Sequence, residues 1–209
     1  MRHIRRWKLQ LTKTVITFPH KKVISDEEIA LYPQQSFAGQ IHIVDSHKTM
    51  RQAVDYLQHS TVLGFDTETR PAFAKHVKYD VALLQLSDDK HAFLFQLQKT
   101  GIPESLAALL SSPAICKVGV AVHDDIVKLH ELCNCNMYGF VDLQTIAKQL
   151  HIENISLKKL TAIVLGFRIS KKQQTSNWEM SALTQAQQIY AATDAWVSYE
   201  MYKKLDGYI

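Results

Sequence analysis

Two carboxylates, Asp66 and Glu68, follow the apolar run Val62-Leu63-Gly64-Phe65. The run is rich in strand formers, so we expect a buried strand that carries both acids at its carboxyl end. Side chains two positions apart on a strand point to the same face, where repulsion and desolvation penalise both charges. A divalent cation would relieve this penalty, and oxygen ligands favour Mg²⁺ or Mn²⁺. The alternative is a strand that runs into a polar turn with solvated acids.

A second pair of acids, Asp124 and Asp125, falls where a predicted strand over 115–120 turns into a helix. We expect Asp124 to cap this helix or to interact with its macrodipole. Asp125 lies one step further in and is the better candidate to reach the carboxyl end of the sheet. His123 could act as a base, although a lone histidine at a helix start is more often structural.

A third site combines Tyr190 and Asp194, which are four residues apart in a predicted long helix. Thr184 and Gln187 have the spacing of a capping box for this helix. Residues four apart lie one turn apart on the same face, and the neighbouring alanines permit close approach to another element. A structural Tyr-Asp pair is the alternative interpretation.

Hydrophobic periodicity predicts the elements that must position these residues. The strands over 81–87 and 91–95 are separated by Asp88-Asp89-Lys90, which indicates an antiparallel hairpin that forms a three-stranded meander with the strand before Asp66. The later alternation of helix and strand indicates a mixed sheet covered by helices. We also expect an edge strand over 41–44 and a loop over 70–75. Helices are expected over 47–59, 102–110 and 143–150. Pro103 marks the start of the helix over 102–110, and Asp142 precedes the helix over 143–150.

The length and composition suit one domain of ordinary size with an added arm. The chain has 209 residues, is 46% hydrophobic and carries a formal net charge of +4, which is weak support for an anionic partner. Cys116, Cys133 and Cys135 form no C-x-x-C pair. They therefore indicate reduced thiols in a cytoplasmic protein, with neither a zinc site nor a disulfide-linked partner.

The first 25 residues carry seven basic residues and no acid, so this arm could contact phosphates or form a solvated extension. It lacks the apolar core of a secretory signal. Ser25 and Glu28 have the spacing of a capping box for a short helix that ends before Pro33. No apolar run approaches 18 residues, so no membrane-spanning helix is expected.

The three sites together resemble the ordered motifs of the DEDD superfamily of 3′-to-5′ exonucleases, in the tyrosine-bearing subgroup and its branch of ribonuclease D and Werner-syndrome exonucleases. The resemblance covers about residues 40–205. The motifs are Phe65-Asp66-Thr67-Glu68, Val118-Gly119 through Asp125, and Tyr190-Ala191-Ala192-Thr193-Asp194, with Val81-Ala82-Leu83-Leu84-Gln85-Leu86 and Ser176-Asn177-Trp178 as further support.

This resemblance implies a single ribonuclease H-like domain over 40–209, with a mixed five-stranded sheet flanked by helices, behind an arm and short helix over 1–39. Many relatives carry Trp where this chain has Thr69. The chain also stops soon after the third motif, which leaves no room for the helical nucleic-acid-binding domains of ribonuclease D proteins.

The resemblance also implies the chemistry, which is hydrolysis of nucleic acid from a single-stranded 3′ end with two divalent cations, Mg²⁺ or Mn²⁺. It assigns Asp66 to both ions, Glu68 and Asp194 to the first, and Asp125 to the second. Tyr190 would orient the attacking water.

Three further residues are candidates for binding the substrate: Thr67, Lys171 and Trp178. Lys171 could instead be a solvated loop lysine, and Trp178 could instead belong to the core. A DNA-directed enzyme, an RNA-directed enzyme and a catalytically inactive nucleic-acid-binding module all share this fold. The sequence does not choose between DNA and RNA, whereas an inactive module should lack a carboxylate, and all four are present.

Overall fold

A six-stranded mixed sheet lies between two layers of helices in the computed structural model, which describes residues 21–71 and 79–208. The strand order is β1-β4-β3-β2-β5-β6, so β2 is internal and β1 is an edge strand, as predicted. The strands are β1 Gln40–Val44, β2 Val62–Thr69, β3 Val81–Ser87, β4 His91–Gln96, β5 Cys116–Gly119 and β6 Phe140–Asp142.

The predicted meander is confirmed, because β2 pairs with β3 and β3 pairs with β4, both antiparallel. The remaining pairs, β1 with β4, β2 with β5, and β5 with β6, are parallel, which makes the sheet mixed. The number of strands is six and not the expected five. The additional strand, β6, has only three residues, too few to show an alternating pattern in the sequence.

The helices are α1 Asp26–Ala30, α2 His47–Leu57, α3 Leu97–Thr100, α4 Glu104–Ser111, α5 His123–Cys133, α6 Leu143–Gln149, α7 Leu157–Leu165 and α8 Gln185–Leu205, followed by a 3₁₀ turn at Asp206–Tyr208. The capping boxes predicted at Ser25 and Thr184 are confirmed, and Ser46 caps α2 in the same way. Helices α3 and α7 have no counterpart among the predictions.

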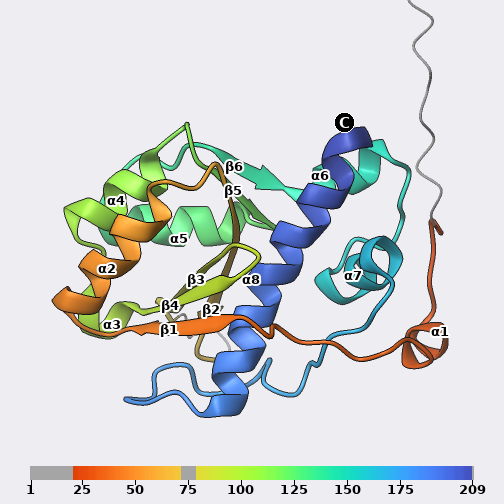
Figure 1. Ribbon diagram of the computed structural model, residues 1–209, viewed down its shortest axis with the longest axis horizontal. Coiled ribbons are helices and arrows are strands. Elements are labelled where there is room, and N and C mark those ends of the chain that lie inside the picture. The colour runs from red at the N-terminus through yellow and green to blue at the C-terminus, as the bar shows by residue number, and fades with distance from the viewer. Residues whose placement is uncertain (1–20, 72–78, 209) are drawn as a thin grey trace, which may run out of the picture.

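The two faces of the sheet are covered by different helices. Figure 1 shows α2, α4 and α5 on one side of the sheet and α6, α7 and α8 on the other. Leu63 and Phe65 of β2 are buried with the apolar side chains of α2, α4 and α5, whereas Val118 of β5 is buried with those of α6, α7 and α8. Burial on both faces explains why β3 is buried at every position, and why β2 is apolar until Asp66.

Gly64 allows α8 to lie unusually close to β2. A Cβ atom at this position would lie 1.9 Å from the backbone oxygen of Ala195 in α8, where no side chain can fit. Gly64 precedes Asp66 by two residues, and Ala195 follows Asp194 directly. The close approach therefore brings the acids of β2 and α8 together.

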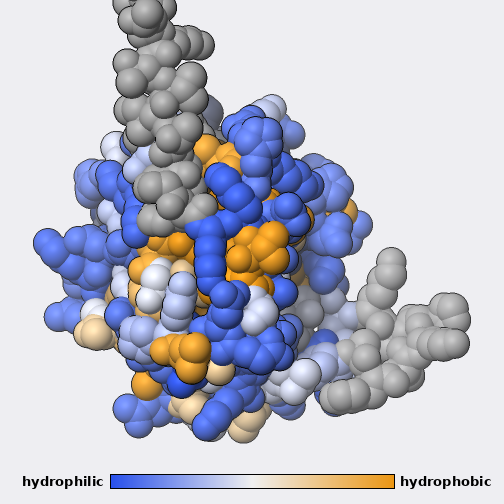
Figure 2. Space-filling view, turned by 90° about the vertical axis from the view of Figure 1, so that its right-hand side faces the viewer, coloured by the Kyte–Doolittle hydropathy of each residue, from blue (hydrophilic) through white to orange (hydrophobic). Residues whose placement is uncertain are grey.

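The segment 21–39 packs against the carboxyl-terminal half of the chain. The backbone N–H of Phe37 donates to the Oγ1 of Thr193 in α8 over 3.0 Å, and Lys158 of α7 forms an ion pair with Asp26 of α1 over 2.9 Å. Figure 1 shows α1 beside α7, and Figure 2 faces this side of the molecule, where hydrophobic patches lie among hydrophilic residues. Residues 1–20 of the predicted basic arm and residues 72–75 of the predicted loop lie outside the described residues.

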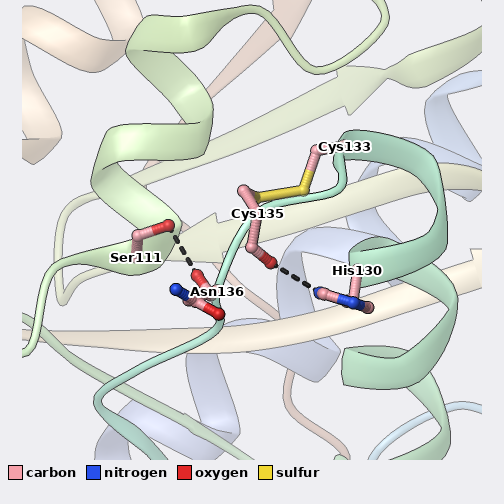
Figure 3. Close-up of a disulfide and its surroundings, with 5 residues drawn as sticks. All are labelled: Ser111, His130, Cys133, Cys135 and Asn136. Atoms are coloured by element: carbon pink, nitrogen blue, oxygen red, sulfur yellow. Dashed lines mark hydrogen bonds between the residues drawn. A yellow bond between two sulfur atoms is a disulfide. The ribbon is translucent and has the colours of Figure 1, made fainter.

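The expectation of three reduced thiols is wrong, because Cys133 and Cys135 form a disulfide within the chain (Figure 3). Cys133 ends α5, and Asn134 adopts a left-handed conformation that turns the chain back on itself. This turn brings two cysteines with only one residue between them into bonding distance. Cys116 is a free thiol.

The prediction of a cytoplasmic location stays a prediction, and the disulfide removes the argument from reduced thiols. No helix within 21–71 or 79–208 is long and apolar enough to cross a bilayer.

Replacement of Gly64 by alanine should force α8 away from β2. Overpacking of this kind costs about 1–3 kcal/mol, so the free energy of unfolding in urea should fall by that amount. The displaced Asp194 should also weaken metal binding. A Gly64→Ala variant with the stability and Mn²⁺ affinity of the parent would show that the close approach does not build the site.

Candidate active site

Three carboxylates from two elements meet at one end of the sheet. Asp66 and Glu68 extend from one face of β2, and Asp194 reaches them from α8, which crosses that face. Each offers one oxygen atom, and these three oxygen atoms lie within 4.8 Å of one another. The first and third acidic motifs therefore lie together in the folded chain, as expected.

Burial and mutual repulsion raise the pKa of each of these groups. Desolvation raises the pKa of Asp66 to about 7, with a further contribution from the charge of Asp125. Desolvation also raises the pKa of Glu68 to about 10, with contributions from Asp66 and Asp194. The pKa of Asp194, which is 4% exposed, is raised well above its usual value by burial and by Asp66. At neutral pH the cluster without a metal therefore retains protons.

Tyr190 lies one helical turn before Asp194 on α8. Burial raises the pKa of its phenol, and the charges of Asp194 and Glu68 raise it further. The hydroxyl is therefore neutral and can donate a hydrogen bond. Its ring packs 5.9 Å from the ring of Trp178, which is 1% exposed. Of the two interpretations of Trp178, the structure places it in the core, where it supports the tyrosine and cannot stack on a base.

Asp125 reaches the same end of the sheet from its other face. The hydroxyl of Thr67, which alternates with Asp66 and Glu68 along β2, donates to the Oδ1 of Asp125 over 2.6 Å. Burial raises the pKa of Asp125, whereas this hydrogen bond lowers it. Asp125 is outside the group of three carboxylates, but its charge contributes to the raised pKa of Asp66. Its Oδ2 atom is free of the bond to Thr67.

A tight turn between β5 and α5 places Asp125. A Cβ atom on Gly119 would lie 2.7 Å from the backbone oxygen of Phe65, and Ala121 adopts a φ of 59°. The carboxylate of Asp142 holds this turn, because its Oδ1 accepts from the backbone N–H of Ala121 over 3.1 Å and from that of Gln144 over 2.8 Å. Asp142 is thus the structural helix cap that the sequence predicts, and it also fixes the start of α5.

The other two polar residues at the start of α5 point to solvent. His123 and Asp124 are exposed, and Val122 occupies the cap position without a side-chain hydrogen bond. Asp124 therefore does not cap the helix, and its place in the first turn fits the second interpretation, an interaction with the macrodipole. His123 has no contact with the three carboxylates.

The carboxylates open into a hollow of about 250 Å³. Tyr190 and Thr67 line it with them, and so does Lys171, the predicted phosphate ligand, which is exposed. Ser156 and Lys158 at the start of α7 also line the hollow but are not among the predicted residues. The signal for them is the serine that precedes the apolar periodicity of α7, which indicates a helix start.

The donor set fits hard divalent cations. Three carboxylate oxygens within 4.8 Å, with a fourth carboxylate beside them, offer the oxygen-only coordination that Mg²⁺ and Mn²⁺ take. The raised pKa values show that the apo arrangement is electrostatically unfavourable. A positive charge in the cluster would remove that cost.

A family model described as 3′-5′ exonuclease matches residues 41–208, and the chain therefore belongs to this family. It is 34% identical over 155 residues to the mouse bifunctional 3′-5′ exonuclease/ATP-dependent helicase WRN, a match that covers 71% of this chain and 11% of the mouse protein. The chain thus spans about a tenth of that relative. The predicted resemblance to 3′-5′ exonucleases is confirmed.

Solved structures confirm the ribonuclease H-like fold. The EXO domain of Nibbler from Aedes aegypti has a TM-score of 0.75 at 21% identity, with 83% of this chain and 92% of that chain covered. The RNase D of Trypanosoma brucei in complex with RNA U12 has a TM-score of 0.73 at 22% identity, with 82% and 64% covered.

The raised pKa values predict how stability depends on pH in the absence of metal. The unfolded chain ionises Glu68 near 4.5, whereas the folded chain ionises it near 10. The free energy of unfolding should therefore fall as the pH rises through this window, because the folded state binds more protons than the unfolded state. Glu68→Gln removes this contribution and should have the higher melting temperature at pH 8 in EDTA.

Saturating Mn²⁺ should reverse this order, because only the parent retains the complete cluster. Melting curves at pH 5 and pH 8, with EDTA or with Mn²⁺, test the prediction. Glu131→Gln, at an exposed position on α5, is the matched control. Its melting temperature should follow that of the parent both in EDTA and in Mn²⁺. A Glu68→Gln variant that melts below the parent in EDTA at pH 8 would contradict the raised pKa of Glu68.

Proposed function

We propose that this domain hydrolyses phosphodiester bonds of single-stranded nucleic acid from the 3′ end and releases nucleoside 5′-monophosphates. The observation that carries the proposal is the meeting of Asp66, Glu68 and Asp194 beside Tyr190 in an open hollow. Membership of the 3′-5′ exonuclease family supports it.

Asp66, Glu68 and Asp194 would hold one divalent cation, Mg²⁺ or Mn²⁺, and Asp66 with Asp125 would hold a second. Bound cations supply an activated water and neutralise charge on the phosphate and on the leaving 3′ oxygen. Thr67 fixes Asp125 through its hydroxyl, so the free oxygen of that carboxylate is oriented before any ion binds. We assign Thr67 this positioning role in place of direct contact with the substrate.

Tyr190 orients the attacking water in this proposal. Its raised pKa keeps the phenol protonated, so it is a hydrogen-bond donor and a poor base. The packing of its ring against Trp178 holds its position.

Lys171 binds a phosphate of the substrate strand in this proposal, because its ammonium group is exposed at the rim of the hollow that holds the carboxylates. Both DNA and RNA present such phosphates. The T. brucei neighbour is an RNase D with bound RNA, whereas the mouse relative is a bifunctional exonuclease and helicase, so the comparisons favour neither sugar.

A 5′-labelled single-stranded decamer, prepared as DNA and as RNA, tests the proposal. Incubation with Mg²⁺ or Mn²⁺ should give a ladder that shortens from the 3′ end, and EDTA should abolish it. Asp66→Asn should abolish the ladder while the protein stays folded. A folded parent that leaves both decamers intact with either metal would contradict the proposed function.

The Tyr190→Phe variant distinguishes the role of the phenol from the role of the carboxylates. It removes the hydrogen bond to the water but no metal ligand, so cleavage should slow by about tenfold to a thousandfold, or roughly 1.5–4 kcal/mol of transition-state stabilisation. Mn²⁺ affinity, measured by calorimetry, should stay within about twofold of the parent. A loss of Mn²⁺ affinity as large as that of Asp194→Asn would show that Tyr190 organises the carboxylates instead.

A further inference from the structure

A second hollow, of about 400 Å³, adjoins the active-site hollow. The two share four wall residues, Lys158, Ile169, Ser170 and Lys171. The outer wall of the second hollow comes from α1 and from Gln34. These residues precede residue 41, where the match to the family model begins. This chain therefore adds a wall to its site that the family match does not include.

Arg168 fixes this added wall in place. Its backbone N–H donates to the carbonyl oxygen of Pro33 over 2.9 Å, and its own carbonyl oxygen accepts from Gln35 over 3.0 Å. Its guanidinium donates to the carbonyl oxygen of Tyr32 over 3.1 Å and to the Oε1 of Gln34 over 2.6 Å. The segment is thus held by main-chain and side-chain bonds, and the hollow exists before any ligand binds.

The charges around the second hollow favour an anion. One acidic side chain, Asp26, lines the hollow. Four basic side chains line it as well: Lys158, Arg168, Lys171 and Lys172. The guanidinium of Arg168 is bonded to a carbonyl and an amide oxygen, which leave its charge uncompensated. Lys158 pairs with Asp26 over 2.9 Å, and its side chain is 22% exposed.

We infer that this second hollow binds a phosphodiester group of the substrate strand upstream of the nucleotide that is removed. The inference rests on the proposed function. A 3′-end nuclease holds only one nucleotide beyond the bond that it cleaves, so a further site that adjoins the catalytic one receives the strand on the 5′ side. The phosphate is the part of a strand that four basic side chains recognise, whatever the base or sugar.

Asp26 would compete with the phosphate for Lys158. Its side chain is 68% exposed, lines the hollow that the phosphate would enter, and pairs with the ammonium group of Lys158. An entering phosphate would compete with Asp26 for that ammonium group. Removal of the carboxylate should therefore strengthen binding of the strand, although it removes an ion pair from the free protein.

Two variants with opposite expected effects test the inference. Lys172→Gln removes a basic group that lines the second hollow but not the catalytic one, and Asp26→Asn removes the acid. For a single-stranded decamer, Lys172→Gln should raise KM about tenfold and flatten its salt dependence, whereas Asp26→Asn should lower KM about threefold. Lys148→Gln carries the same charge change at an exposed residue of α6 that lines neither hollow, and it should alter KM less than twofold.

The p-nitrophenyl ester of thymidine 5′-monophosphate is the control substrate, because it fills only the catalytic hollow. Its hydrolysis should be the same in the parent and in all three variants. Equal shifts of the decamer KM in Lys172→Gln and Lys148→Gln, or a raised KM in Asp26→Asn, would overturn the inference.

A binding measurement keeps this test independent of catalysis. The dissociation constant of a fluorescein-labelled decamer in EDTA should follow the same order, with Asp26→Asn tightest and Lys172→Gln weakest. If the parent cleaves neither the decamer nor the ester, the proposed function fails and this order alone decides the inference. If the parent cleaves both and the variants bind alike, only the inference fails.

Discussion

The burial of three carboxylates, together with their mutual repulsion, is the constraint on which the rest of this structure depends. Asp66, Glu68 and Asp194 converge within 4.8 Å, and their raised pKa values report the cost of that convergence. The fold meets this cost with an extensive core on both faces of the sheet. Gly64 then lets α8 lie directly on β2, so the acids cannot move apart without loss of that packing. The site is strained as apo protein and suited to cations.

The sequence predicted the parts of the site that depend on local periodicity. Alternation along β2 places Asp66 and Glu68 on one face, and helical spacing places Tyr190 one turn from Asp194. The distance between the two elements is not a local property. Gly64 carries that information, but its significance depends on the oxygen of Ala195, which the sequence cannot place. Their convergence was therefore inferred from family resemblance and not from spacing.

Other features escaped prediction for similar physical reasons. The strand β6 is stabilised by parallel pairing with β5 and is too short for a periodic signal. The disulfide needs the left-handed turn at Asn134, which brings Cys135 back to Cys133. The sequence alone is compatible with Trp178 in the core and with Trp178 as a platform for a base. In the structure its side chain is buried and its ring packs against Tyr190. Each of these features depends on which distant segments of the chain meet. The second hollow is a further example, because its walls come from α1 and from the segment after α7.

We propose that these carboxylates bind two divalent cations, and proton release on metal binding is the sharpest test of that site. Without metal at pH 7, Glu68 with its pKa of about 10 is protonated, and Asp66 with its pKa of about 7 is partly so. Cation binding requires the ionised forms and must release these protons. Calorimetric titration with Mn²⁺ in buffers of different ionisation enthalpy should show two ions bound and more than one proton released per chain. Binding with no proton release, or no Mn²⁺ binding at all, would show that these carboxylates do not form the proposed cation site.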